Sequence, residues 1–165
     1  VRVLYETAEG FVPALTIVVA SSLFGWVLQF EHIDQKMIEF FFSITSNKYI
    51  ITLFLNILLL ICGMFLDSTP VILLFVPMFL PLGEALGIHD VQMGVMIVLN
   101  LMIGLMTPPI GQSLFIMATT TNNRFEYVVK NTWKWLIPLL IVLLLTAYIP
   151  DVTLFLPRLF GLIKP

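Results

Sequence analysis

The sequence has 165 residues, of which 59% are hydrophobic and only 11% are charged, and its formal net charge is -2. Soluble domains are about 45–50% apolar and about 25% charged, so this composition excludes an ordinary soluble globular protein and favours an integral membrane protein. The small net charge gives no reason to expect nucleic acid as a partner. The sequence begins at Val1 rather than at methionine, which suggests a fragment or a processed piece.

The composition along the chain predicts an all-α, polytopic membrane protein. Residues 11–30 carry no charge and are long enough for one transmembrane helix. Residues 31–48 mix aromatic and charged side chains, as is typical of an interfacial helix that lies along the membrane surface. Residues 133–150 are predicted as the last transmembrane helix, with Trp133 near the membrane interface and Pro150 at its end.

A first break is predicted at DSTP, residues 67–70, because the surrounding apolar run is too long for one crossing. The 35 residues between Lys48 and Glu84 would form a helix of about 52 Å, against a hydrocarbon core of about 30 Å. Pro70 has no N–H, so it ends the first helix, and Thr69 suits the N-cap of a new helix with Pro70 as its first residue.

The segment after this break holds Pro77 and Pro81 and looks too short and too interrupted for a full crossing. We therefore predict that residues 49–86 form a re-entrant hairpin of two half-depth helices, with non-helical backbone at its tip. In the alternative interpretation both arms cross fully, and the acidic residue of the DSTP motif lies in a surface loop.

A second break is predicted in the next uncharged run, at the sequence GLMTPPIG. Pro108 and Pro109 have no N–H groups to donate to the preceding turn. Thr107 is expected to cap a second half-helix that begins at Pro108. Residues 91–121 are therefore predicted to form a broken helix.

Breaks of this kind predict a binding site. The carbonyl groups expected to lose their partners, those of Leu66, Gly104 and Leu105, suit a small hard cation such as Na⁺, and Asp67 adds a formal negative charge. A half-helix N-terminus favours an anionic group, and Pro-interrupted apolar segments are typical of secondary-transporter sites. The competing interpretation is that both breaks are ordinary proline kinks.

The remaining polar residues suggest structural roles. Asn56 and Asn100 are single polar residues on apolar helices, where hydrogen bonding between helices is the commoner role. No arrangement of nucleophile, histidine and acid is present in the sequence, so no enzyme activity is predicted.

Three stretches resemble one known family, the large membrane subunit of tripartite ATP-independent periplasmic (TRAP) transporters. They are GMFLDSTPVILLFVPMFLPL, GIHDVQMGVMIVLNLMIGLMTPPIGQSLF and PDVTLFLPRLFG, and SSLFGWVLQ also fits the pattern. The resemblance implies an elevator-type secondary transporter built from two inverted repeats, each with a re-entrant hairpin and a broken helix. The present chain, residues 1–165, would then be the second repeat, the carboxy-terminal half.

The resemblance also implies a function. Such subunits couple the uptake of organic acids, such as sialic acid or C4-dicarboxylates, to Na⁺ entry across the bacterial inner membrane. Their partners are a periplasmic substrate-binding protein and a small membrane subunit, and this chain would further need the amino-terminal half of the large subunit. Two other functions stay open: a Na⁺-coupled divalent-anion symporter that needs no binding protein, and a structural membrane subunit.

Carried over by position, the resemblance implies Na⁺ ligands around both breaks, mostly backbone oxygens. These residues are Asp67, Thr69, Gly104, Met106, Thr107 and Gly111. Ser68 and Thr107 are expected to lie near the substrate.

Overall fold

Helices make up nearly all of the chain in the computed structural model, which describes residues 2–162 and the side chains of residues 11, 12 and 15–162. Residue 1 and residues 163–165 of the predicted unit lie outside the described residues. The helices are α1 (Arg2–Phe30), α2 (Ile33–Ile44), α3 (Lys48–Phe65), α4 (Ser68–Ala85), α5 (Asp90–Leu105), α6 (Gln112–Thr120), α7 (Phe125–Tyr148) and α8 (Pro150–Leu159). Because residues 2–162 contain no strand, the predicted all-α class is confirmed.

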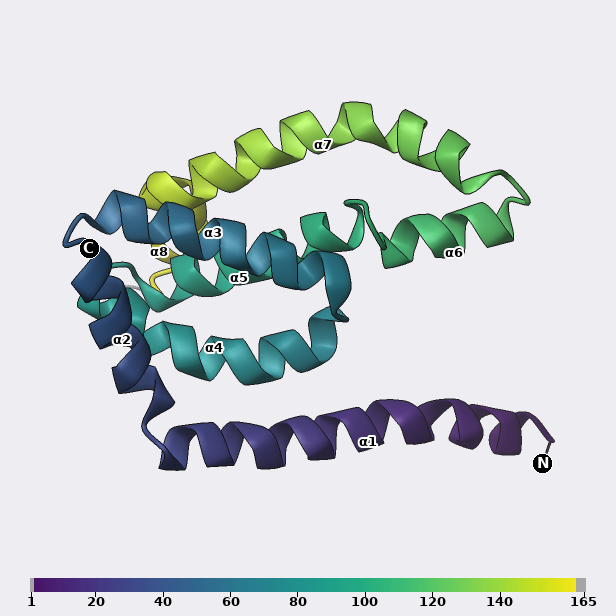
Figure 1. The fold of residues 1–165 in the computed structure, drawn as a ribbon, viewed down its shortest axis with the longest axis horizontal. Coiled ribbons are helices and arrows are strands. Elements are labelled where there is room, and N and C mark those ends of the chain that lie inside the picture. Colours follow the sequence, from purple (N-terminus) through teal and green to yellow (C-terminus); the bar gives the residue numbers. More distant parts are fainter. Residues whose placement is uncertain (1, 163–165) are drawn as a thin grey trace.

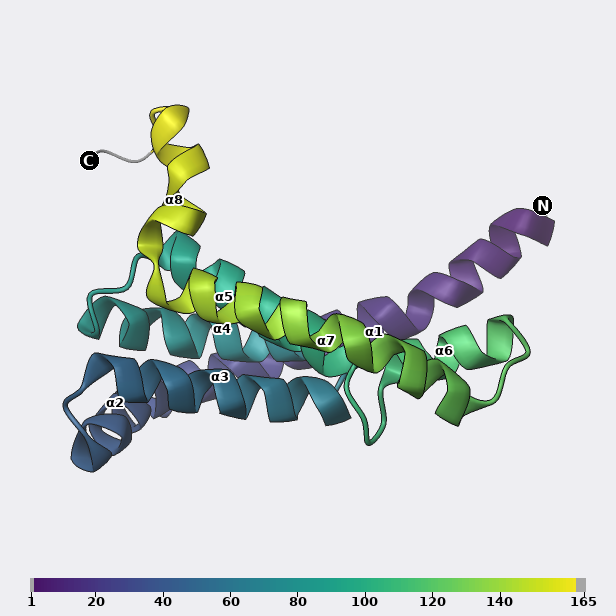
Figure 2. The same ribbon diagram turned by 90° about the horizontal axis from the view of Figure 1, so that it is seen from above.

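Helix α5 lies at the centre of the fold, where it contacts α3, α4, α7 and α8. Helices α3 and α4 form a hairpin with arms in opposite directions, and α5 runs beside α3 in the same direction (Figures 1 and 2). Helix α1 packs along α4, and α6 extends beyond the end of α5. The break after α3 and the break after α5 therefore lie at the same end of the bundle.

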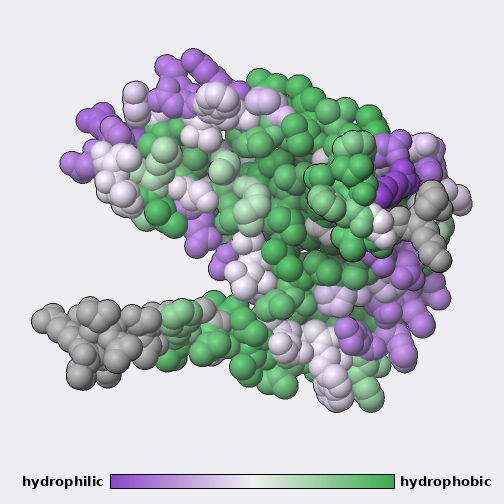
Figure 3. All heavy atoms as spheres, turned by 180° about the vertical axis from the view of Figure 1, so that it is seen from behind, coloured by the Kyte–Doolittle hydropathy of each residue, from purple (hydrophilic) through white to green (hydrophobic). Residues whose placement is uncertain are grey.

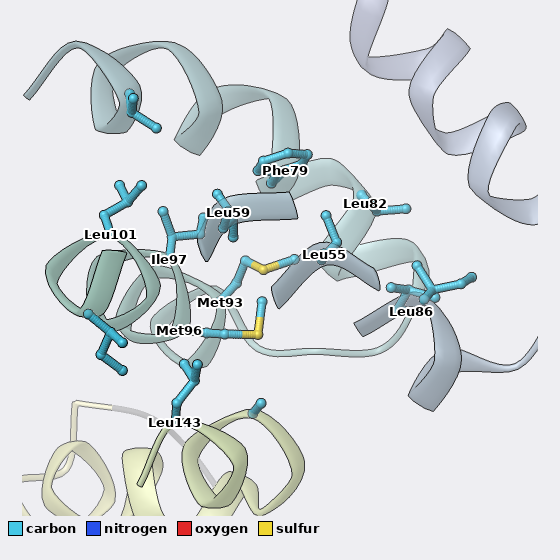
Figure 4. Close-up of a cluster of buried hydrophobic side chains, with 14 of the residues drawn as sticks. Leu55, Leu59, Phe79, Leu82, Leu86, Met93, Met96, Ile97, Leu101 and Leu143 are labelled. Carbon is cyan, nitrogen blue, oxygen red and sulfur yellow. The ribbon is translucent and has the colours of Figure 1, made fainter. Parts of the chain in front are cut away.

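The core is made mainly of apolar side chains from α3, α4 and α5, together with Phe41 of α2 and three residues of α7. The fully enclosed members seen in Figure 4 are Leu55, Leu59, Phe79, Leu82, Met93, Met96, Ile97 and Leu101. On α5 the buried positions recur at intervals of three and four residues and spread around the helix, as expected for a helix that is covered on several sides. This packing holds α3 and α5 together along their length.

The outer surface is apolar as well. Helix α7 exposes Trp133, Trp135, Ile137 and Ile141, and in Figure 3 apolar side chains cover the middle of the visible face while hydrophilic ones gather towards the ends. By length and composition α3, α4 and α7 can each cross a membrane, and Leu15–Phe30 with α2 would make a fourth span with a 64° bend. An apolar exterior of this kind indicates a multi-pass membrane protein.

The expectation that the arm after the first break is short and interrupted is wrong. Helix α4 is one continuous helix of 18 residues that includes Pro77 and Pro81, and its length of about 27 Å is close to the thickness of the hydrocarbon core. Prolines are tolerated inside membrane helices because neighbouring helices and local adjustments satisfy the freed backbone groups. The re-entrant depth of residues 49–86 and the interfacial position of residues 31–48 stay predictions.

Candidate functional site

The ends of α3 and α5 meet where two glycines face each other. A Cβ atom on Gly104 would lie 2.6 Å from the carbonyl carbon of Gly63 and 2.7 Å from its Cα. A Cβ atom on Gly63 would lie 3.0 Å from the Cα of Leu101. The two backbones are therefore in direct contact, as small residues allow in membrane helix pairs. Each glycine lies within one turn of a break, so this contact places the breaks beside each other.

The first break is only two residues long. Leu66 and Asp67 have extended backbone angles between α3 and α4, and Asp67 is the N-cap of α4. The expected cap at Thr69 and helix start at Pro70 are thus wrong by two residues. The reason is that the first four N–H groups of a helix have no intrahelical partner, so Pro70 fits within the first turn and need not begin it.

The second break is longer than expected and occupies residues 106–111. Thr107 does not cap a helix that starts at Pro108; instead α6 begins at Gln112 with Gly111 as its N-cap. Gly111 has a left-handed backbone with φ of 53°, a conformation that costs a residue with a side chain about 1–2 kcal/mol. The left-handed cap explains why α6 can start only after this glycine.

The last turn of α5 tightens before the prolines. The N–H of Thr107 donates to the Gly104 carbonyl at 2.9 Å, and that of Met106 donates to the Ile103 carbonyl at 3.1 Å. The Thr107 hydroxyl also donates to the Ile103 carbonyl, at 2.7 Å. The expectation that the Gly104 carbonyl is left without a partner is therefore wrong, because three-residue hydrogen bonds replace the missing four-residue ones.

The other two carbonyl groups expected to lose their partners, those of Leu66 and Leu105, have no backbone donor. Among residues 2–162 no backbone N–H donates to the carbonyl of Leu66 or of Leu105. The residues four positions later are Pro70 and Pro109, which have no N–H to offer. Such carbonyl oxygens are available to another partner, such as water or a cation.

These features share one open pocket of about 370 Å³. Residues 63–67 line one side of it, and Leu105, Ile110 and Gln112 line the other. The lining thus contains Leu66 and Leu105, whose carbonyl groups have no backbone donor, together with the carboxylate-bearing Asp67. Hard oxygen donors with a single negative charge fit a cation such as Na⁺ better than a transition metal.

The Asp67 carboxylate is available to bind a cation. Its side chain is exposed and makes no capping hydrogen bond, and its one described contact is with the Ser68 hydroxyl, which lies 3.4 Å from Oδ1. Among the described residues no three His, Cys, Asp or Glu side chains lie in an arrangement that could hold a metal ion. Asp67 is also the only charged residue between Lys48 and Glu84. Any cation held here would therefore be bound by this carboxylate and by neutral oxygens.

The predicted site residues lie around the pocket, but most of them do not line it. Of the predicted set only Asp67 lines the pocket. The others lie within two residues of a lining residue, on the same two breaks: Ser68, Thr69, Gly104, Met106, Thr107 and Gly111. Ser68 is buried, whereas Thr69 is exposed in the first turn of α4. The two breaks, predicted separately, thus contribute to the lining of one pocket.

Most residues that line the pocket were not predicted as site residues, and two of them are informative. Gln112 is an exposed polar side chain on the pocket wall, directly after the Gly111 cap. Gly63 makes the close contact with Gly104. The available signals were a polar residue immediately after TPPIG and a glycine four residues before Asp67 in an otherwise bulky apolar run.

The fold and the pocket define the class: a multi-pass helical membrane protein with two interrupted segments that meet at one pocket, which contains a single carboxylate. Residues 1–152 match the model of the family described as tripartite ATP-independent periplasmic transporter, DctM component. The chain belongs to this family, which confirms the resemblance seen in the sequence.

Named relatives agree with this assignment. The chain is 37% identical, over 97% of its length, to the sialic acid TRAP transporter large permease protein SiaM of Vibrio cholerae and covers 38% of that protein. It is 33% identical, over 98% of its length, to the C4-dicarboxylate TRAP transporter large permease protein DctM of Pseudomonas aeruginosa, again covering 38%. It is also 33% identical, over 91% of its length, to the isethionate TRAP transporter permease protein DctMQ of Oleidesulfovibrio alaskensis, covering 24%.

These relatives are transporter permeases and not enzymes, in agreement with the sequence prediction. The chain spans well under half of the length of the curated relatives it matches.

Proposed function

We propose that the chain is the carboxy-terminal half of a TRAP transporter large permease, which takes up an organic acid together with Na⁺ across the bacterial inner membrane. Membership of the DctM family supports the transporter class. The relatives named for sialic acid, C4-dicarboxylates and isethionate support an organic acid as the substrate. The partners in this proposal are the amino-terminal half of the subunit, a small membrane subunit and a periplasmic binding protein.

The observation that carries the Na⁺ proposal is the pocket between the two breaks. It brings together one carboxylate, at Asp67, and two residues with undonated carbonyl groups, Leu66 and Leu105. A carboxylate in a membrane protein is costly unless a cation or a hydrogen-bond donor compensates its charge. A Na⁺ ion bound here would compensate Asp67 and would be released when the pocket opens to the side with low Na⁺.

The substrate anion belongs near the same tip. Helix α4 begins at Ser68, and its N-terminus carries the positive end of the helix dipole, which favours a carboxylate. Ser68 and Thr107 have hydroxyl groups that can donate to the substrate, although the Thr107 hydroxyl donates to the Ile103 carbonyl in this structure. In the proposed elevator mechanism, the hairpin and the broken helix move as one unit with the bound substrate and Na⁺.

The test is Na⁺-dependent uptake by the complete transporter in proteoliposomes, with Asp67→Asn against wild type. Removing the charge while keeping the shape of the side chain should raise the Na⁺ concentration for half-maximal uptake by about tenfold or more, since losing one charge-assisted interaction costs about 1.5–3 kcal/mol. The matched control is Glu84→Gln, which removes an exposed carboxylate from the far end of the same helix.

Asp67→Asn should therefore raise the Na⁺ concentration for half-maximal uptake, whereas Glu84→Gln should leave it unchanged. An unchanged Na⁺ curve for Asp67→Asn, with the complex assembled, would show that the tip of the hairpin is a structural bend. That outcome would favour the structural-subunit interpretation of the two breaks. A shift of the same size in Glu84→Gln would show that the effect is one of overall charge and not of the pocket.

A further inference from the structure

The seam between α3 and α5 carries a buried polar contact as well as the glycine contact. Asn56 is 3% exposed and Asn100 is 0% exposed, and the Nδ2 of Asn100 donates to the Oδ1 of Asn56 at 2.6 Å. This confirms the prediction that the two residues join helices. It is a side-chain hydrogen bond between the two helices that end at the breaks.

Both amides are also tied to backbone in their own helix. The Nδ2 of Asn100 donates to the Met96 carbonyl at 2.8 Å, and the Nδ2 of Asn56 donates to the Thr52 carbonyl at 2.7 Å. Asn56 further contacts the sulfur of Met96 at 3.5 Å. Each side chain is thus held in one orientation, and the bond between them forms in only one alignment of the two helices.

A contribution to protein stability does not by itself explain why two amides, Asn56 and Asn100, are buried between α3 and α5. The Oδ1 of Asn100 is buried and has no partner among the described residues. A buried acceptor without a donor is destabilising, and two apolar side chains of similar size would avoid that cost. The best-attested role for a buried polar residue of this kind is to fix the register between helices.

Register matters here because it decides whether the two breaks share a pocket. Asn56 lies ten residues before Leu66, and Asn100 lies five residues before Leu105. A slip of one residue between the helices would move one break by about 1.5 Å along the axis and turn it by about 100°. Such a turn would take Leu105 out of the pocket that it lines with Asp67.

The glycine contact and the asparagine pair act on the same seam in different ways. Gly63 and Gly104 let the two backbones touch, and a slip of one residue would bring a bulky neighbour of Gly104 to that contact. The contact therefore restricts the register close to the breaks. The bond between Asn56 and Asn100 lies further from the breaks and is directional, since a hydrogen bond weakens steeply away from its preferred angle. The glycines thus set the separation of the helices, and the bond adds a directional restraint on their alignment.

We propose that Asn56 and Asn100 are positioning residues that fix the register of α3 and α5, and thereby hold Asp67 opposite the second break. The effect of these residues on Na⁺ affinity rests on the function proposed above, whereas their effect on the alignment of α3 and α5 does not. Neither residue lines the pocket, so their action on it is through the helices.

The first measurement is cross-linking across the pocket, which needs no transport. Met64, at the end of α3, and Ile110, in the second break, both line the pocket, so Met64→Cys and Ile110→Cys in a Cys62→Ser background report the distance between the breaks in the complete transporter in membranes. With a short bifunctional reagent, Asn100→Leu and Asn56→Leu should each reduce the cross-linked fraction severalfold. The double variant should be no worse than either single one, because both remove the same bond.

The matched control is Gln92→Leu. Gln92 is also a buried amide on α5, but its Nε2 donates to the Thr146 and Ala147 carbonyls of α7, at 3.1 and 3.0 Å. This variant should lower thermal stability and leave the cross-linking unchanged. Should a leucine variant fail to assemble, Asn100→Ser tests the same bond with a smaller polar side chain.

The second measurement is Na⁺-dependent uptake. Loss of one interhelical hydrogen bond worth about 1 kcal/mol should raise the half-maximal Na⁺ concentration about three- to tenfold in Asn100→Leu, with little change in Gln92→Leu. Unchanged cross-linking in both asparagine variants, or equal loss in Gln92→Leu, overturns the proposal. Reduced cross-linking together with a normal Na⁺ curve for Asp67→Asn would retain the positioning role and reject the Na⁺ site instead.

Discussion

Gly104 shows how one residue can determine the geometry of the site. Sequence comparison with the family suggested it as a cation ligand, and the structure shows a packing role, because its missing side chain lets α5 touch α3 at Gly63. Its carbonyl already accepts the Thr107 N–H. A hydrogen atom in place of a side chain is thus what allows the two breaks to lie beside each other.

A methyl group at this position should therefore be strongly destabilising. In Gly104→Ala the new Cβ would lie 2.6 Å from the carbonyl carbon of Gly63 and 3.0 Å from the carbonyl oxygen of Leu60, and both are backbone atoms that cannot turn aside. We expect a loss of about 1–3 kcal/mol, as is typical of overpacking. The measurement is thermal unfolding of the purified complex in detergent.

Gly94→Ala is the matched control on the same helix. No heavy atom lies within 4 Å of a Cβ built at Gly94, so alanine should be neutral or stabilise the helix by up to about 1 kcal/mol through its higher propensity. Equal melting temperatures for the two variants would show that α3 and α5 are not in backbone contact in the assembled protein.

At the scale of helices and breaks, the sequence predicted the positions of the two interruptions, but it misplaced the residues that cap the helices after them. Both breaks lie where prolines interrupt long apolar runs, as expected. The caps at Thr69 and Thr107 were misplaced because proline fits any position of a first helical turn, and because the left-handed backbone of Gly111 delays α6. No local rule could show that the breaks meet, since that depends on contacts between residues 41 positions apart, Gly63 and Gly104.

The hairpin of α3 and α4 allows two placements in a bilayer. Each arm has 18 residues, or about 27 Å, so length alone permits full crossings. In both placements Lys48 and Glu84, at the open end of the hairpin, face the same side of the membrane. The placements differ at the tip, which is at mid-depth in a re-entrant hairpin and at the opposite surface in a full one.

A cysteine at the tip distinguishes them. Thr69 is exposed, so Thr69→Cys in a Cys62→Ser background should react with charged, impermeant reagents. The proposed re-entrant site predicts slow labelling that Na⁺ and substrate decrease, because a carboxylate and a cation at mid-depth are reached only through the pocket. Rapid labelling from the side opposite to Lys48→Cys, unaffected by Na⁺, would instead establish two full crossings.

At the scale of the whole molecule, much of the apolar surface is not covered by this chain. Helix α1 exposes Val12, Leu15, Val19 and Leu23 along one face, and α7 is largely apolar on its outside. Since the chain covers 38% of the SiaM and DctM relatives, lipid and the rest of the subunit are the expected neighbours of these faces. The transport cycle therefore belongs to the assembled protein.

The charge of the pocket leads to a prediction about delivery. Its lining contains Asp67 and no Lys or Arg, so a free organic anion would meet a negative charge and no cationic side chain. Bound Na⁺ can offset that charge, and a binding protein docked on the permease can raise the local substrate concentration to about the millimolar range. We therefore expect uptake by the complete complex to need Na⁺ and the substrate-loaded binding protein together.

The measurement is proteoliposome uptake of the radiolabelled acid with its binding protein, without it, and with a binding protein specific for a different acid. Only the first condition should give uptake well above background, because the other two leave the anion to enter a negatively charged pocket from dilute solution. Equal uptake of the free acid would instead identify a Na⁺-coupled symporter that needs no binding protein. In that case the missing positive charge has to come from the half of the transporter that lies outside this chain, and basic residues there become the next to substitute.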